Sequence, residues 1–288
     1  MNTIPVRNSP DAIAITPNGN YAYITNWDNM TVSVINTSTN RVVKIIPVGV
    51  NPNGIAITPN GNYAYVVNLN NNRVSVINTS TNRVVKIITV GNSQDAIAIT
   101  PNGNYAYVVN WNNNRVYVIN TSTNRVVKII TVGNSPDAIA ITPNGNFAYV
   151  AKGDNNTVSV INISTNAVVK TIPVRNPDAI AITPNGNYAY VANSNSSTVS
   201  VINTSTNAVV NTIPVGSGPA GIAITPNGNY AYVTNYNSST ISVINTSTNS
   251  VVKTILVSSG PYGVAITPNG NYVYVTDWAN GTVSVIRT

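Results

Sequence analysis

The acidic residues of this 288-residue chain are seven aspartates, because the sequence contains no glutamate. It also contains no histidine and no cysteine. These absences remove the commonest general base, thiolate metal sites and disulfide bonds. We therefore predict no catalytic centre, no cofactor and no metal site. Any chemistry must come from aspartate, tyrosine, basic, hydroxyl or amide groups.

Four of the aspartates occupy one position of a sequence repeat, each directly before a short apolar segment: Asp11, Asp95, Asp137 and Asp178. Asn53, Ala220 and Tyr262 take this position in the other copies. If the copies surround a channel, the carboxylates meet at its mouth and could bind a hard cation. Alternatively, each carboxylate accepts hydrogen bonds from backbone amides of its own turn, as Asn53 can. We favour the second interpretation, because Ala220 and Tyr262 interrupt a sevenfold cage.

The three tryptophans, Trp27, Trp111 and Trp278, share a second repeat position, which is Tyr236 in another copy. Leu69, Gly153 and Ser194 complete the series. Large amphipathic rings on a loop can anchor a protein or stack on a sugar. Alternatively, each ring covers the groove between two repeats, because tryptophan is often largely buried. We predict Trp27, Trp111, Trp278 and Tyr236 as the main contact residues.

The fourth repeat departs most from the others. It carries Lys152 and Asp154 in one loop and Arg175 in a following loop that is one residue shorter. Such a cluster could bind an anionic group through charge-assisted hydrogen bonds. Alternatively, these residues form a solvated ion pair that contributes little to stability.

Fourteen Lys and Arg residues give the chain a net charge of +7. Many of them recur in the first three repeats: Arg41, Lys44, Arg83, Lys86, Arg125 and Lys128. A basic arc of this kind could bind a polyanion such as DNA. We favour a structural interpretation, in which the charges discourage pairing between exposed sheet edges.

The string TPNGNY, with Phe for Tyr in one copy, recurs at intervals of 42, 42, 42, 41, 42 and 42 residues, beginning at Thr16. In the first unit, residues 12–16, 21–26, 31–36 and 41–48 are rich in Val, Ile, Thr and Tyr and are separated by turn residues. This pattern predicts four short strands, A to D, in each unit. Seven units predict an all-β fold, a seven-bladed β-propeller with four-stranded antiparallel blades, as one domain over residues 1–288.

The two ends of the sequence complement each other. The last unit stops after its third strand, whereas Thr3, Ile4, Pro5 and Val6 reproduce the fourth strand at residues 171–174. We predict that residues 3–6 complete the last blade and close the ring. An open solenoid is the alternative. Closure would place the D–A and B–C loops, with the Asp and Trp residues, on one face.

Three segments that follow TPNGN identify a resemblance: YAYITN at 21–26, YAYVTN at 230–235 and YVYVTD at 272–277. They resemble the YVTN-type propeller repeat of archaeal surface-layer proteins. The resemblance implies a structural or adhesive role at the cell surface. We predict a non-enzymatic interaction module that binds a protein or cell-wall glycan through the Asp and Trp face. Alternatives are polyanion or DNA binding through the basic arc, and a propeller hydrolase or lyase.

The chain has no apolar run of the ~20 residues that a membrane-spanning helix requires. Its opening residues also lack the charged, apolar and small-residue regions of a secretory signal. We therefore expect no membrane insertion. An extracellular or cell-surface location follows from the resemblance, and we expect the isolated domain to be monomeric.

Overall fold

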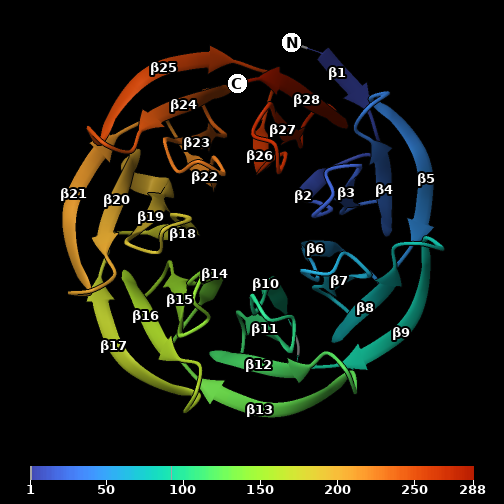
Figure 1. Ribbon diagram of the computed structural model, residues 1–288, viewed down its shortest axis with the longest axis horizontal. Helices are drawn as coiled ribbons and strands as arrows, with labels where there is room; N and C mark the ends of the chain where they lie inside the picture. Colours follow the sequence, from blue (N-terminus) through green and yellow to red (C-terminus); the bar gives the residue numbers. More distant parts are fainter. Residues whose placement is uncertain (1, 92) are drawn as a thin grey trace.

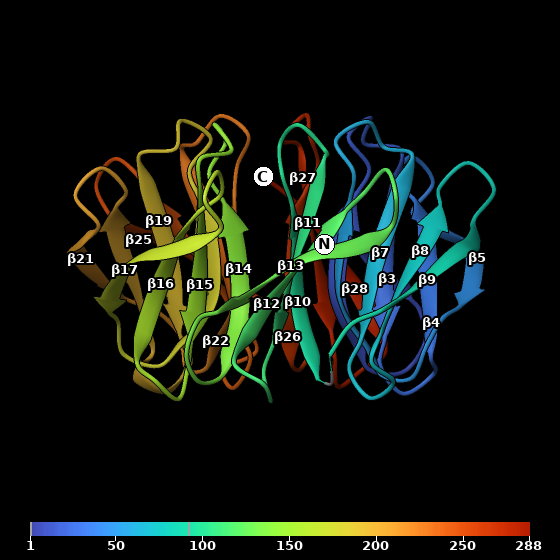
Figure 2. The same ribbon diagram turned by 90° about the horizontal axis from the view of Figure 1, so that it is seen from below.

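The computed structural model describes residues 2–91 and 93–288. Over these residues the chain forms seven four-stranded antiparallel sheets arranged in a ring around a central axis (Figure 1). We call the region along this axis, between the inner strands, the channel. Seen from the side, the ring is a disc whose loops project from its two faces (Figure 2). The predicted seven-bladed propeller is confirmed.

The strands lie in four layers from the channel outward, and each blade contributes one strand to each layer. The inner A strands are β2 (Pro10–Ile15), β6 (Pro52–Ile57), β10 (Gln94–Ile99), β14 (Pro136–Ile141), β18 (Pro177–Ile182), β22 (Pro219–Ile224) and β26 (Pro261–Ile266). The B strands are β3 (Tyr21–Asn26), β7 (Tyr63–Asn68), β11 (Tyr105–Asn110), β15 (Phe147–Lys152), β19 (Tyr188–Asn193), β23 (Tyr230–Asn235) and β27 (Tyr272–Asp277).

The third and fourth layers complete the blades. The C strands are β4 (Thr31–Asn36), β8 (Arg73–Asn78), β12 (Arg115–Asn120), β16 (Thr157–Asn162), β20 (Thr198–Asn203), β24 (Thr240–Asn245) and β28 (Thr282–Arg287). The outer D strands are β5 (Arg41–Pro47), β9 (Arg83–Thr89), β13 (Arg125–Thr131), β17 (Ala167–Pro173), β21 (Ala208–Pro214), β25 (Ser250–Leu256) and β1 (Asn2–Pro5). A short 3-10 turn, η1 (Ser194–Ser196), follows β19.

The core lies between neighbouring blades, where apolar side chains of one sheet pack on the next. A tyrosine at the centre of most B strands is buried there, and its hydroxyl reaches the C–D turn of the following blade. Tyr23, for example, donates to Asn82 Oδ1 over 2.6 Å. Neighbouring blades are thus joined by apolar burial and, at six of the seven junctions, by a tyrosine hydrogen bond.

The ring closes through β1, which pairs antiparallel with β28 from Asn2 opposite Val285 to Pro5 opposite Thr282. Ile4 is only 3% exposed and joins a core cluster that contains Ala22 and Tyr274. Figure 1 shows β1 lying outside β28 at the rim. The predicted closure is confirmed, and the open solenoid is wrong.

The outer D strand also agrees with the placement of prolines. Pro5, Pro47, Pro173 and Pro214 end D strands, where a missing backbone N–H removes no bond to a further strand. The inner strands differ from the expectation, because β2 begins at Pro10 and not at Ala12. Pro10 pairs with Asn26 ahead of a register shift.

Within the described part of the chain, no helix is long and apolar enough to cross a membrane.

Candidate binding site at the channel mouth

A β-bulge at the start of every A strand sets the direction of the residue at the channel mouth. In β2 the register shifts between Pro10 and Ile13, so Asp11 lies in the bulge. Corresponding shifts occur in the other blades. A bulge leaves a residue outside the regular pairing and re-aims its side chain. The repeat therefore presents one variable side chain per blade at the channel mouth.

The aromatic loop position lies beside this bulge. The backbone N–H of Trp27 donates to Ser9 O over 2.9 Å, which joins the B–C loop to the D–A loop of the same blade. The same bond recurs at Tyr236 and Trp278. The two kinds of loop therefore share one face, as predicted.

A cavity of about 320 Å³ lies at this face, lined by Asp11, Trp27, Asn53, Tyr236, Tyr262 and Trp278. The rings of Tyr236 and Tyr262 meet edge to face, with centroids 6.3 Å apart and planes at 88°. Trp111 does not line the cavity and is 45% exposed. All six lining residues thus come from the two repeat positions singled out in the sequence, the channel-mouth position (Asp11, Asn53 and Tyr262) and the aromatic loop position (Trp27, Tyr236 and Trp278).

The four mouth aspartates form one electrostatic group in the channel. Burial and, to a smaller extent, the nearby carboxylate of Asp178 together raise the pKa of Asp11 to about 7. Burial also raises the pKa of Asp178 to about 6. The pKa of Asp95 is raised well above its usual value by burial and by Asp137, Asp11 and Asp178. Carboxyl groups from four blades therefore disfavour one another's ionisation.

Two hydrogen bonds partly offset this effect. Asn53 Nδ2 donates to Asp95 Oδ1 over 2.5 Å, and the backbone N–H of Gly153 donates to Asp137 Oδ2 over 2.6 Å. The pKa of Asp137 is nevertheless raised to about 7, mainly by burial. The expectation that each carboxylate bonds within its own turn is wrong here, because these donors come from a neighbouring blade and from a B–C loop.

Asp11 is the most buried of the four, at 6% exposed, and its Oδ1 has no hydrogen-bond partner among the described residues. Over the same residues, no group of three or more aspartates is arranged to hold a metal ion.

Backbone contacts hold Tyr262 and Asp11 in place. Thr234 Oγ1 donates to Tyr262 O over 2.6 Å, and Thr276 Oγ1 donates to Asp11 O over 2.6 Å. Next to them, a Cβ at Gly221 or Gly263 would overlap the carbonyl oxygen of Tyr262 or Asp11. The sequence signal was the joint change of two positions in the last two repeats, to Gly in the A strand (Gly221 and Gly263) and to Thr in the B strand (Thr234 and Thr276).

Comparison with known proteins agrees with this architecture. The family model described as "Lactonase, 7-bladed beta-propeller" matches residues 96–212 and again residues 169–288, together more than half of the chain. The chain belongs to this family. A model of the LVIVD repeat also matches residues 11–34.

A solved structure titled "Kuenenia stuttgartiensis Hydrazine Synthase" is similar to this member of the lactonase propeller family, with a TM-score of 0.90 and 24% sequence identity. The similarity covers 98% of this chain and 96% of the other. At this identity it shows the fold alone. No curated protein matches the chain. The YVTN-type resemblance therefore rests on the sequence motifs.

The three charged residues of the fourth blade do not form an anion site in this propeller. Lys152 is only 3% exposed, and its Nζ donates to Val132 O over 2.8 Å. Burial lowers the pKa of Lys152. Asp154 is exposed and accepts a hydrogen bond from Ser135 Oγ over 2.5 Å, and Arg175 is also exposed. Lys152 therefore serves the packing between blades, which a repeat alignment cannot reveal.

The basic arc lies on the rim, where its residues are exposed on β5, β9 and β13. The same strands expose Val43, Val85 and Val127. Charged side chains on an outer strand discourage pairing with another chain, which exposed apolar residues alone would favour. This placement fits the structural interpretation of the arc.

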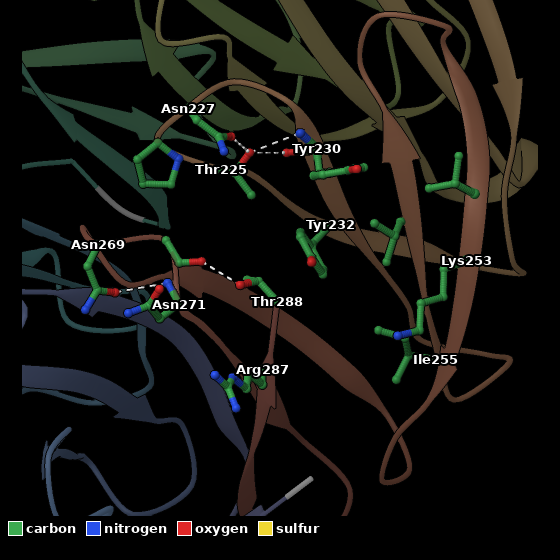
Figure 3. A pocket seen from close by; sticks show the side chains of 14 residues that line it. Thr225, Asn227, Tyr230, Tyr232, Lys253, Ile255, Asn269, Asn271, Arg287 and Thr288 are labelled. Atoms are coloured by element: carbon green, nitrogen blue, oxygen red, sulfur yellow. Dashed lines mark hydrogen bonds between the residues drawn. The ribbon is translucent and has the colours of Figure 1, made fainter.

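A second, larger cavity of about 830 Å³ lies between the sixth and seventh blades, on the face that carries the A–B turns. In Figure 3, Tyr232 lies between the turn at Thr225 and the outer-strand residues Lys253 and Ile255. The tyrosine hydroxyls at the equivalent position in six blades donate to an asparagine of the next C–D turn. In the seventh blade the outer strand is β1, so no turn joins it to β28, and the cavity lies where that turn would pack.

We expect an added turn to stabilise the propeller. The variant carries Arg287→Asn and the extra residues Ser-Thr-Asn after Thr288, which reproduces Asn-Thr-Ser-Thr-Asn. One buried hydrogen bond contributes about 1 kcal/mol, so the Tm measured by calorimetry should rise by about 2–4 °C. An added Ser-Thr-Ala is the control. Tyr232→Phe should remove the gain; a gain that survives it contradicts the role assigned to the hydroxyl.

Proposed function

We propose that the protein is a non-catalytic binding module that holds its partner at the channel mouth. The observation that carries this proposal is the cavity lined by Trp27, Tyr236, Tyr262 and Trp278 together with Asp11 and Asn53. Binding cavities are concave, mostly apolar and supplied with a few oriented polar groups. Aromatic side chains in such places contribute disproportionately to binding.

The backbone around the cavity supports the same function. Threonine hydrogen bonds fix the carbonyls of Tyr262 and Asp11 against the neighbouring blades. Loop-to-loop bonds fix Trp27 and Trp278. A site that is already ordered loses little entropy on binding. The repeated blades thus act as a rigid frame for one variable surface.

The YVTN-type motifs support a setting at the cell surface. A module of the surface-layer type there would bind a neighbouring protein or a cell-wall glycan. Large amphipathic rings suit both partners, because they present apolar area together with a polar edge. The acidic mouth disfavours a partner that is itself anionic.

A lactone hydrolase is the second candidate, favoured by the family description and by the carboxyl groups with a pKa of about 7 at Asp11 and Asp137. A general base is most effective when its pKa lies near the working pH. Lactone hydrolysis measured by titration of released acid would support this alternative if Asp11→Asn abolished it.

The binding proposal is tested by replacing the cavity tryptophans. The double variant Trp27→Ala/Trp278→Ala should weaken retention on cell-wall material and on glycan arrays at least about tenfold, because both rings line the cavity. Trp111→Ala is the matched control, since Trp111 occupies the same repeat position outside the cavity. Thermal melts establish that all variants fold. Equal retention of wild type and double variant would contradict the proposal.

A further inference from the structure

We infer that the channel-mouth cavity binds an alkylated ammonium group, because it places four aromatic rings beside the buried, unpartnered carboxyl group of Asp11. This inference rests on the proposed function and names the chemistry of the bound group. Two sources share this chemistry: a free quaternary ammonium compound such as choline, and a methylated lysine side chain on a protein.

The charge of the site calls for a cation. Asp11 lines the cavity, and its buried Oδ1 has no hydrogen-bond partner among the described residues, so no donor within the protein offsets the charge of this carboxylate as a cation in the cavity would. The charged neighbours that raise the pKa of Asp11 and Asp95 are all carboxylates. Asp178 raises the pKa of Asp11, and Asp137, Asp11 and Asp178 raise the pKa of Asp95. A channel with low-dielectric walls and one sign of charge concentrates ions of the opposite sign at its mouth.

The aromatic lining selects an organic cation. Trp27, Tyr236, Tyr262 and Trp278 form four of the six lining side chains. Tyr236 and Tyr262 stand nearly at right angles, so they form two walls of a corner. Cations bind over aromatic faces through the ring quadrupole, and cages of such rings recognise quaternary ammonium groups. The cavity of about 320 Å³ is at the small end of the range for small-molecule sites.

The same features argue against a metal ion. Calcium takes six to eight oxygen ligands and magnesium demands near-octahedral oxygen coordination. Within the described residues, no three aspartates are grouped to supply such ligands. Aromatic rings provide none. An alkylammonium group needs only one carboxylate and apolar walls, which the cavity supplies.

Ionisation of the site links binding to pH. The titratable groups that interact with Asp11 are Asp178 on β18, Asp95 on β10 and Tyr262 on β26, and Asp137 on β14 acts in turn on Asp95 and Tyr262. A bound cation favours the ionised form of the carboxyl groups. Because the pKa of Asp11 is about 7 without ligand, binding should release protons near neutral pH. The affinity should therefore rise between about pH 5 and about pH 8.

The experiment titrates the full chain with choline, with tetramethylammonium and with a trimethyllysine peptide, and follows tryptophan fluorescence and heat. The matched control ligand is 3,3-dimethylbutanol, which has the shape of choline without its charge. The ammonium ligands should bind saturably, and at least about tenfold more tightly than the neutral analogue. Tighter binding of choline or of the peptide identifies the source.

Three variants complete the test. Asp11→Asn keeps the shape and removes the charge, so it should weaken choline binding at least about tenfold and remove most of the pH dependence. Trp278→Ala should weaken binding similarly, and Trp111→Ala should leave it unchanged. Thermal melts check that each variant folds.

The opposite results would overturn the inference. They are equal binding of the neutral analogue, binding of calcium without choline, no saturable binding of any ammonium ligand, or unchanged affinity in Asp11→Asn. Each leaves the proposed function standing if the cavity tryptophans still control retention on cell-wall material or glycans. Loss of that control would refute the proposed function separately.

Discussion

Deleting residues 2–6 should lower the Tm by more than about 10 °C. The deletion removes four paired residues of β1 and the side chain of Ile4, which is 3% exposed. Loss of a buried Ile costs about 2–5 kcal/mol, and each lost ladder hydrogen bond costs about 1 kcal/mol more. It also exposes the edge of β28, which invites pairing between molecules.

Point variants separate the ring closure from the loss of residues in general. Ile4→Ala keeps the strand and should lower the Tm less than the deletion. Thr3→Ala, at an exposed position, should change it by less than about 1–2 °C. A synthetic peptide with the deleted sequence should restore part of the lost stability. A deletion variant with the wild-type Tm in calorimetry would show that closure contributes nothing.

Raising the pH from about 5 to about 8 should destabilise the protein, with a fall in Tm of roughly 5 °C or more. The usual pKa of an aspartate is 3.8, and the folded values for Asp11, Asp137 and Asp178 are about 7, 7 and 6. The folded state thus binds more protons than the unfolded chain between these values. Stability gained by protonation is present at low pH and is lost as the pH rises through the folded pKa.

Removing the charge should flatten this dependence. Asp11→Asn and Asp137→Asn should each raise the Tm at pH 8 more than at pH 5. The exposed Asp28 provides the control, because Asp28→Asn removes a charge outside the channel. Thermal melts across the pH range measure the effect. A Tm that rises with pH in the wild type would contradict the buried carboxyl cluster. Such a cluster lowers the folding stability at neutral pH but provides a negatively charged site, and functional sites often reduce stability in this way.

The fold was predictable because its signals are local and repeated. The spacing of TPNGNY, the prolines that end D strands and the match between residues 3–6 and 171–174 all follow from the sequence. Together they define the number of blades, the strand order and the closure. The start of the A strands was misplaced by two residues, because Pro10 pairs with Asn26 ahead of a bulge, and a recurring proline indicates a loop as readily as the first residue of a strand.

The site was only partly predictable. The shared face of Asp11, Trp27 and Trp278 follows from the topology, and the cavity confirms it. Two features could not be predicted, because they depend on how distant blades approach each other across the channel. One is that Trp111 lies outside the cavity, and the other is which groups form hydrogen bonds with the carboxylates. Lys152 illustrates the same limit. Its departure from the repeat suggested a surface role, whereas its long side chain reaches Val132 O in the interior.

The position of the closing strand also determines how the molecule responds to force. Because β1 and β28 belong to the same blade, tension between the two ends of the chain acts first on the short ladder that joins them. Every other blade consists of four consecutive strands and can detach as a unit. Pulling on both ends of the chain would therefore first separate β1 from β28 and then unfold the remaining blades one by one. The strength of the β1–β28 ladder sets the force at which unfolding begins.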